Sequence, residues 1–178
     1  PPHATDFRPK PPPKAPAPMT KQTTIYTDGA GPSGNKPSTK CTPAGWGFVA
    51  MDTHVRHESA GAVITDPQHA RWLGAQIGSN NTGELTAILE GAVWAYHTPT
   101  VREVEFRYDS KYAAKLAAGE WEPATNLLLV KAVRLAIKHL ESRTHVSFAH
   151  VKAHTGELWN ERADALAGSG LRKFRPPP

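Results

Sequence analysis

The segment Thr23-Thr24-Ile25-Tyr26-Thr27-Asp28-Gly29 joins a run of β-branched and aromatic residues to an aspartate and a glycine. Such a run is typical of a β-strand, and Asp-Gly commonly ends one, so we expect a strand over Thr23–Thr27. Val104–Tyr108 has the same character and is also followed by an aspartate, Asp109. If the two strands are neighbours in one sheet, Asp28 and Asp109 lie side by side at its edge.

The rest of the chain alternates strand and helix patterns around these two strands. Further strands are expected at Trp46–Met51, within Glu58–Ile77 and at Val146–His150. Helices are expected from about Asn81 to Tyr96 and over Ser110–Ala118, Asn126–Leu140 and Trp159–Ala167, the last ended by Gly168 and Gly170. This order of elements predicts an α/β fold, a mixed sheet with helices packed on it.

Length, charge and cysteine content narrow the class of protein. With 178 residues the chain has room for one ordinary domain. Its formal net charge of +5 favours a polyanionic partner, although the same charge also fits simple solubility. Cys41 is the single cysteine, which excludes an intramolecular disulfide and suits a reducing, intracellular compartment (nucleus or cytoplasm). Because no stretch is apolar enough for a membrane span or a secretory signal, we expect no membrane partner.

Prolines gather at both ends of the chain. Residues 1–20 are rich in Pro, Lys and Ala and carry too little apolar surface to pack, so we interpret them as a linker. A docking ligand for a proline-binding module is the alternative. The chain ends in Pro176-Pro177-Pro178, and residues 171–178 are expected to be a tail. The folded domain is then residues 21–170, and the flanks suggest that it belongs to a larger polyprotein.

A third acidic residue, Glu84, falls in the first turn of the helix expected near Asn81. A helix that crosses the sheet can bring Glu84 to the edge where Asp28 and Asp109 are expected. Such a group of carboxylates repels itself unless protons or cations neutralise it, and carboxylate oxygens suit Mg²⁺ or Mn²⁺. The alternative is a local role for each residue: a turn aspartate, a glutamate at a helix N-terminus and an N-cap aspartate.

Four sequence motifs, in order along the chain, resemble those of the ribonuclease H type 1 family. They are Ile25-Tyr26-Thr27-Asp28-Gly29, Ser79-Asn80-Asn81-Thr82-Gly83-Glu84-Leu85, Tyr108-Asp109-Ser110-Lys111-Tyr112, and Val151-Lys152-Ala153-His154-Thr155-Gly156 followed by Asn160-Glu161-Arg162-Ala163-Asp164-Ala165-Leu166-Ala167. One Thr-Asp-Gly has no specificity, but four ordered motifs spanning about Thr23 to Ala167 are a specific signal. The resemblance implies an RNase H-like mixed five-stranded sheet flanked by helices. It fits either a free-standing enzyme or the RNase H module of a retroelement or reverse-transcriptase polyprotein.

The resemblance also implies the chemistry of the site. The catalytic carboxylates would be Asp28, Glu84, Asp109 and Asp164, which hold two Mg²⁺ ions, with Mn²⁺ as a substitute. The expected reaction is hydrolysis of the RNA strand of an RNA–DNA hybrid, leaving 5′-phosphate and 3′-hydroxyl ends. Two divalent ions can activate the water and stabilise the leaving oxygen without a protein nucleophile.

His154 and Asp164 take their assigned roles from the fourth motif. His154, on a loop that ends in a glycine, would help the attacking water or product release. On its own it would be interpreted as a solvated loop histidine. Asp164 would otherwise be an exposed helix residue, but its helix also carries Ala163, Leu166 and Ala167, which places it near the sheet-facing side.

The resemblance places substrate-binding residues around the carboxylates: Gly29, Ser79, Asn80, Asn81, Trp121 and Asn126. Backbone atoms at Gly29 and the two asparagines would contact 2′-hydroxyl groups, which distinguish RNA from DNA. Ser79 would bind a phosphate, and Trp121 would offer the DNA strand a flat aromatic surface. The alternatives are helix capping for Asn80, Asn81 and Asn126, and a core position for Trp121.

The chain departs from the family pattern in two respects. Ala114–Leu128 holds one Lys and no Arg, so the basic helical protrusion of many members is absent or reduced. Pro32–Pro43 and Thr53–Arg71 look longer than in compact members and have no assigned role.

Two other functions compete with this interpretation. A non-catalytic hybrid-binding module is disfavoured by the intact acidic set. Another nuclease of the superfamily, such as a transposase or junction resolvase, is disfavoured by the Asp-Ser-Lys-Tyr and His-Thr-Gly motifs.

Overall fold

The computed structural model describes residues 22–32, 37–53, 56–152 and 156–178. His154 and the expected linker, residues 1–20, lie outside the described residues. The elements in chain order are β1 (Gln22–Ala30), β2 (Gly45–Met51), β3 (Arg56–Ala62), α1 (Asn80–His97), β4 (Glu103–Tyr108), α2 (Lys111–Ala117), α3 (Leu127–Glu141), β5 (His145–His150) and α4 (Leu158–Leu171).

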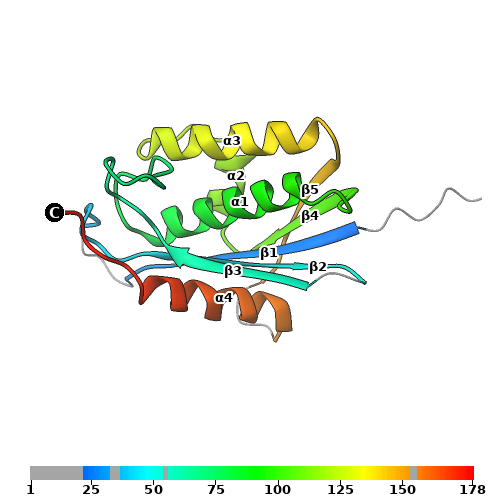
Figure 1. The fold of residues 1–178 in the computed structure, drawn as a ribbon, viewed down its shortest axis with the longest axis horizontal. Helices are drawn as coiled ribbons and strands as arrows, with labels where there is room; N and C mark the ends of the chain where they lie inside the picture. Colours follow the sequence, from blue (N-terminus) through cyan, green and yellow to red (C-terminus); the bar gives the residue numbers. More distant parts are fainter. Residues whose placement is uncertain (1–21, 33–36, 54–55, 153–155) are drawn as a thin grey trace, which may run out of the picture.

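The strands form one five-stranded sheet in the order β3-β2-β1-β4-β5. β1 pairs antiparallel with β2 and parallel with β4; β2 and β3 are antiparallel, and β4 and β5 are parallel. Helices α1, α2 and α3 lie on one side of the sheet and α4 lies on the other (Figure 1). The expected mixed five-stranded sheet flanked by helices is therefore confirmed.

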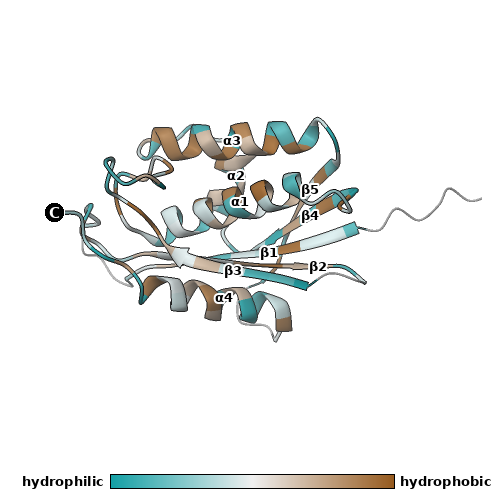
Figure 2. Cartoon of the chain, viewed as in Figure 1, coloured by the Kyte–Doolittle hydropathy of each residue, from teal (hydrophilic) through white to brown (hydrophobic). Residues whose placement is uncertain are grey.

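The main hydrophobic core lies between the sheet and the α1–α3 layer. Ile25 of β1, Phe48 of β2 and Phe106 of β4 are fully or almost fully buried there, beneath Ile88 of α1. Hydrophobic and hydrophilic residues alternate along α3 in Figure 2, as in a helix that buries one face. Leu128 of α3 is 52% exposed, whereas its neighbour Leu129 is fully buried.

The opposite face of the sheet carries α4 on a layer of small residues. A Cβ added at Gly47 of β2 would lie 2.6 Å from the Ala167 nitrogen, and one added at Gly170 would lie 2.1 Å from the Gly61 carbonyl oxygen. Side chains at these positions would force the helix away from the strands. The expectation that Gly168 and Gly170 end this helix is wrong: α4 continues to Leu171, and Gly170 serves close packing instead.

Three other boundaries differ from the sequence-based expectation. β1 continues through Asp28 and Gly29, because both residues still pair with β2. Helix α1 begins at Asn80, one residue before the expected start near Asn81, and Ser79 caps it. Beyond α4, Phe174 is buried, so packing extends past residue 170, where we expected the folded domain to end.

Among the described residues, none of the helices is long and apolar enough to cross a membrane. The described segment between α2 and α3 contains no helix.

Candidate active site

Asp28 and Asp109 face one another across the central parallel pair of strands. Tyr26 of β1 is the register partner of Arg107 of β4, so two residues further along both strands Asp28 lies beside Asp109. Asp28 is buried and Asp109 half-buried. The Asp28 carboxylate accepts a hydrogen bond from the Gly29 backbone N–H at 2.7 Å. The two aspartates that end the strand motifs thus meet at one edge, as the sequence predicted.

Glu84 reaches the same point because two glycines let α1 approach β1 closely. A Cβ added at Gly29 would lie 2.2 Å from the Glu84 backbone nitrogen, and one added at Gly83 would lie 2.3 Å from the Gly45 carbonyl oxygen and 2.9 Å from the Gly29 Cα. Only hydrogen fits at either position. The first turn of α1 therefore rests directly on the strand backbone, with the Glu84 side chain next to Asp28.

The three carboxylates form one compact group. An oxygen from each of Asp28, Glu84 and Asp109 lies within 4.8 Å of the other two. Burial raises the pKa of Glu84 well above its usual range, and the charges of Asp28 and Asp109 raise it further. Burial, together with the charges of Asp109 and Asp164, raises the pKa of Asp28 to about 7. Negative charge on this group is therefore costly, because water cannot fully solvate it.

The donor set fits a divalent cation. The group offers carboxylate oxygens, the ligands that Mg²⁺ and Mn²⁺ prefer. Glu84 Oε2 is buried, and no described residue gives it a hydrogen bond. A buried acceptor without a donor is costly, and a bound cation would satisfy it.

The metal-free protein is expected to become less stable as pH rises. The folded-state pKa values of Asp28 and Glu84 are raised, so their protonated forms favour the fold. This stability is fully present below their unfolded values at pH ~4. The part due to Asp28 is lost as pH rises through about 7, and the part due to Glu84 is lost as pH rises through its raised pKa. Mg²⁺ replaces the protons, so it should raise the melting temperature more at about pH 8 than at about pH 5. Thermal denaturation with and without Mg²⁺ measures this, and an equal Mg²⁺ effect at both pH values would contradict it.

Asp164 lies outside this compact group. It is exposed on α4, on the opposite face of the sheet from α1, although its charge acts on Asp28. Its neighbour Ala163 is fully buried against Tyr26 and Val49. Asp164 is therefore exposed although the residue before it is buried against the sheet, so its expected place near the sheet-facing side holds only in part.

The capping alternative for Asn80 and Asn81 is wrong. Ser79 caps α1: its Oγ accepts from the Thr82 N–H at 3.1 Å, and Thr82 Oγ1 accepts from the Ser79 N–H at 2.8 Å. The side chains of Asn80 and Asn81 are exposed beside the carboxylates. Their exposure leaves them accessible to a ligand.

Asn126 precedes α3 but its side chain does not cap the helix. It is buried, and its Oδ1 accepts hydrogen bonds from the Gln76 N–H at 2.8 Å and the Ile77 N–H at 3.4 Å. Asn126 therefore ties the segment before Ser79 to the start of α3. It also lines a pocket together with Ser79 and Asn81.

Trp121 is not a core residue, because 46% of it is exposed. Its ring packs edge-on against Tyr112, which lines the same pocket as Ser79, at 5.9 Å between centroids. The Lys115 ammonium lies 5.3 Å from the Trp121 ring centroid. The exposed surface from the pocket to Trp121 thus combines hydroxyl groups, aromatic rings and positive charge.

One group near the site was missed from the sequence. Arg107 donates to Tyr26 Oη at 3.0 Å and to Glu157 at 3.1 Å, and its Nε donates to Glu105 at 2.7 Å. Glu157 immediately precedes α4, so Arg107 joins the sheet to the start of that helix. The sequence held one signal for this group: Tyr26 and Arg107 each lie two residues before an aspartate of the site, so neighbouring parallel strands bring them side by side.

A comparison with protein-family models gives a match to RNase H over residues 20–172. The chain belongs to the RNase H family. Its enzyme class is that of the ribonucleases H, which are hydrolases, and the acidic group of Asp28, Glu84 and Asp109 is consistent with a divalent-metal site typical of this family.

Relatives and solved structures agree with this RNase H assignment. The chain is 33% identical to ribonuclease HI of Caulobacter vibrioides over 172 residues, covering 89% of this chain and 98% of that protein. It is 34% identical to a ribonuclease H of Chlorobium phaeovibrioides over 167 residues, covering 87% and 99%.

Two solved structures share the fold. RNase H1 of Halobacterium salinarum aligns with a TM-score of 0.62 and 24% identity, covering 86% of this chain and 99% of that chain. LC11-RNase H1, solved in complex with an RNA/DNA hybrid, aligns with a TM-score of 0.58 and 23% identity, covering 85% and 97%. At this identity the likeness concerns the fold alone.

Proposed function

We propose that this protein hydrolyses the RNA strand of RNA–DNA hybrids with divalent ions held by Asp28, Glu84, Asp109 and Asp164. The observation that carries the proposal is the compact group of three carboxylates in a chain of the RNase H family. Two Mg²⁺ ions, or Mn²⁺ in their place, would activate the attacking water and stabilise charge on the leaving oxygen. The products would be 5′-phosphate and 3′-hydroxyl ends.

The protein's own part in catalysis is to hold the carboxylates in place before substrate binds. Asp28 and Asp109 project from paired strands, and Glu84 projects from a helix packed on backbone, so no large movement is needed to assemble them. Burial excludes competing water from Asp28 and Glu84. His154, which precedes α4 in the sequence, would assist the attacking water or product release as a general acid or base.

Recognition of the hybrid would divide between the two strands. Asn80 and Asn81, with backbone atoms at Gly29, lie beside the carboxylates and would contact the 2′-hydroxyl groups of the RNA. The pocket that contains Ser79 and Asn126 would take a phosphate of the DNA strand, and exposed Trp121 would pack against its sugars or bases.

Two of the earlier expectations gain no support from the relatives. The two relatives described above are named as ribonucleases H, and the alignments cover 98% and 99% of their own length. They give no support to membership of a retroelement polyprotein or to partners reached through the Pro-rich flanks. The intracellular, reducing compartment expected from the single Cys41 stays a prediction.

Cleavage of a labelled hybrid, duplex RNA and duplex DNA, each with Mg²⁺ and with excess chelator, tests the proposal. We expect cleavage of the RNA strand of the hybrid alone, and none with chelator, because the carboxylates need cations to bring a phosphodiester close. Binding of the hybrid without cleavage would support the non-catalytic module instead. Equal cleavage of duplex DNA would point to another nuclease of the superfamily, and undiminished cleavage in chelator would exclude the metal mechanism.

A further inference from the structure

The N-terminal half of α4, which carries Asp164, packs on the sheet through a small apolar cluster and close backbone contact. Its cluster contains Ala163 packed with Tyr26 and Val49, with Trp159 and Leu166 only partly buried. Backbone contacts hold both halves: a Cβ added at Gly47 would lie 2.9 Å from the Ala163 carbonyl oxygen, and Gly170 of the C-terminal half lies against Gly61. A directional polar contact on the exposed side of this half would add to the packing and help to fix the orientation of Asp164.

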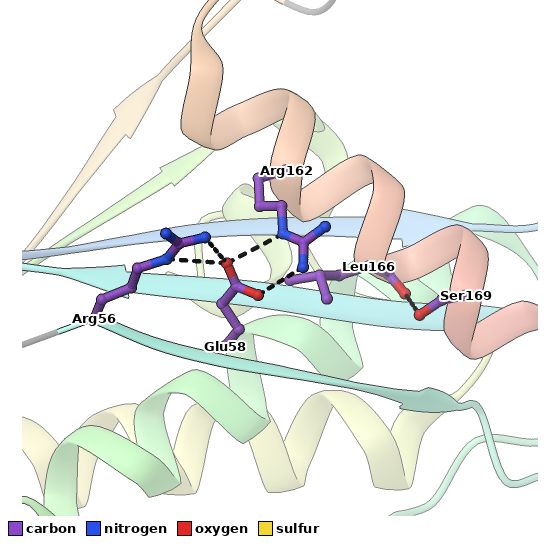
Figure 3. Close-up of polar contacts among 5 residues, drawn as sticks. All are labelled: Arg56, Glu58, Arg162, Leu166 and Ser169. Carbon is purple, nitrogen blue, oxygen red and sulfur yellow. Dashed lines mark hydrogen bonds and ion pairs between the residues drawn. The ribbon is translucent and has the colours of Figure 1, made fainter.

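A forked ion pair supplies such a contact from β3. Arg162 donates from Nε to Glu58 Oε1 at 3.1 Å and from Nη2 to Glu58 Oε2 at 2.8 Å. Figure 3 shows Arg162 reaching from α4 to the strand, where Arg56 approaches the same carboxylate from the other side. Arg56 Nη2 lies 2.6 Å from Glu58 Oε1, and its guanidinium lies 4.7 Å from the Trp159 ring centroid. Two-point pairing fixes direction as well as distance.

Glu58 is charged whenever the enzyme would work. Hydrogen bonds from Arg162 and Arg56 lower the pKa of Glu58 to about 2. The side chain is 21% exposed, so solvent weakens the pair without removing it. The pair should therefore contribute modestly to overall stability while still orienting the helix.

We propose that Glu58 is a positioning residue for the metal site. Through its ion pair with Arg162 it fixes the orientation of the turn of α4 that carries Asp164, and so holds Asp164 towards Asp28, Glu84 and Asp109. Arg162 and Asp164 lie two positions apart on the same turn, so a rotation that breaks the ion pair also moves Asp164. Since Asp164 is exposed and lies outside the compact carboxylate group, its distance from that group depends on how α4 lies on the sheet. The inference rests on the proposed function in that Asp164 serves the metal.

Glu58→Gln tests this inference by weakening the ion pair without touching a carboxylate of the site. The Mg²⁺ midpoint is the Mg²⁺ concentration that gives half of the Mg²⁺-induced rise in melting temperature. We expect this midpoint to increase about fivefold in the variant, the factor that corresponds to ~1 kcal/mol. The rate of hybrid cleavage at saturating Mg²⁺ should stay within about twofold of the wild type, since excess metal compensates for weaker binding. Glu58→Asp keeps the charge but shortens the reach, and should fall between the two.

Glu161→Gln is the matched control, because it removes a carboxylate from the same turn of α4 and leaves the Glu58–Arg162 pair intact. It should leave the Mg²⁺ midpoint within about twofold of the wild type. In the Glu58→Gln/Arg162→Gln double variant the midpoint should move no further than in Glu58→Gln alone, because the two residues act as one unit.

Several results would overturn the inference. A lower metal-free melting temperature in Glu58→Gln with an unchanged Mg²⁺ midpoint would show that Glu58 acts on stability alone. Additive shifts in the double variant, or an equal shift in Glu161→Gln, would show that the pair has no special part. A wild type that Mg²⁺ does not stabilise would remove the site to be positioned. The Mg²⁺ midpoint needs no substrate, so a failure to cleave hybrids refutes the proposed function separately.

Discussion

Asp109→Asn, like Asp28→Asn, is expected to abolish nearly all cleavage of the hybrid while leaving the fold intact. The substitution keeps the volume of the side chain and removes one negative charge from a group whose oxygens lie within 4.8 Å of one another. A divalent ion loses a charged ligand, and the reaction loses the charge stabilisation it depends on. Turnover under saturating Mg²⁺ is the measurement. Activity above about a tenth of wild type, ~1.4 kcal/mol of barrier, would remove the residue from the catalytic set.

The metal-free melting temperature distinguishes this effect from damage to the fold. In both variants it should hold or rise, because burying one charge fewer relieves the repulsion that raises the pKa of Asp28 and Glu84. Asp66→Asn is the control, since Asp66 accepts a local hydrogen bond from the Gln68 N–H on the segment after β3 and lies outside the carboxylate group. It should change neither cleavage nor the effect of Mg²⁺.

Gly83→Ala is expected to destabilise the protein and to impair cleavage, although alanine favours helix. A Cβ at this position would lie 2.3 Å from the Gly45 carbonyl oxygen and 2.9 Å from the Gly29 Cα, so α1 must move away from β1. Overpacking of this kind costs about 1–3 kcal/mol and outweighs the gain of up to ~1 kcal/mol in helix propensity. Because Glu84 is the next residue, the same movement separates its carboxylate from Asp28.

Gly168→Ala is the matched control, another glycine inside a helix. A Cβ there would meet only the Arg172 side chain, at 3.8 Å, which is ordinary contact. This variant should be as stable as the wild type or more stable by up to ~1 kcal/mol, with unchanged cleavage. Chemical denaturation of both variants measures the difference. If Gly83→Ala proved as stable and active as Gly168→Ala, close contact between α1 and β1 would not be what brings Glu84 to the site.

Local sequence patterns predicted much of the candidate active site. The β-branched runs before Asp28 and Asp109 predicted two strands, and the structure pairs them in parallel with the aspartates side by side. Glu84 could be placed only within a helical turn, because the approach of α1 depends on glycine contacts between residues distant in the sequence. Asp164 was assigned to its helix from the sequence, yet its exposure depends on how α4 lies across the strands.

Where local and tertiary demands disagreed, the tertiary contacts prevailed. Gly168 and Gly170 were interpreted as a helix stop, but the close approach of Gly170 to Gly61 holds the helix together past that point. Helix capping was the alternative role for Asn126, but its Oδ1 accepts hydrogen bonds from the backbone N–H groups of Gln76 and Ile77 instead. Trp121 had been assigned equally to the core and to the surface, and packing against Tyr112 leaves it at the surface.

The sequence by itself determined the type and order of nearly all the elements and the acidic residues that follow the strands, because these depend on side-chain periodicity and on residues next to one another in the chain. Only the tertiary structure decided which carboxylates share one group, how burial alters the pKa of Asp28 and Glu84, and that Glu58 of β3 meets Arg162 of α4. Those features depend on distances between segments far apart in the sequence. The backbone contacts at Gly29, Gly83 and Gly170 set such distances, and no local pattern records them.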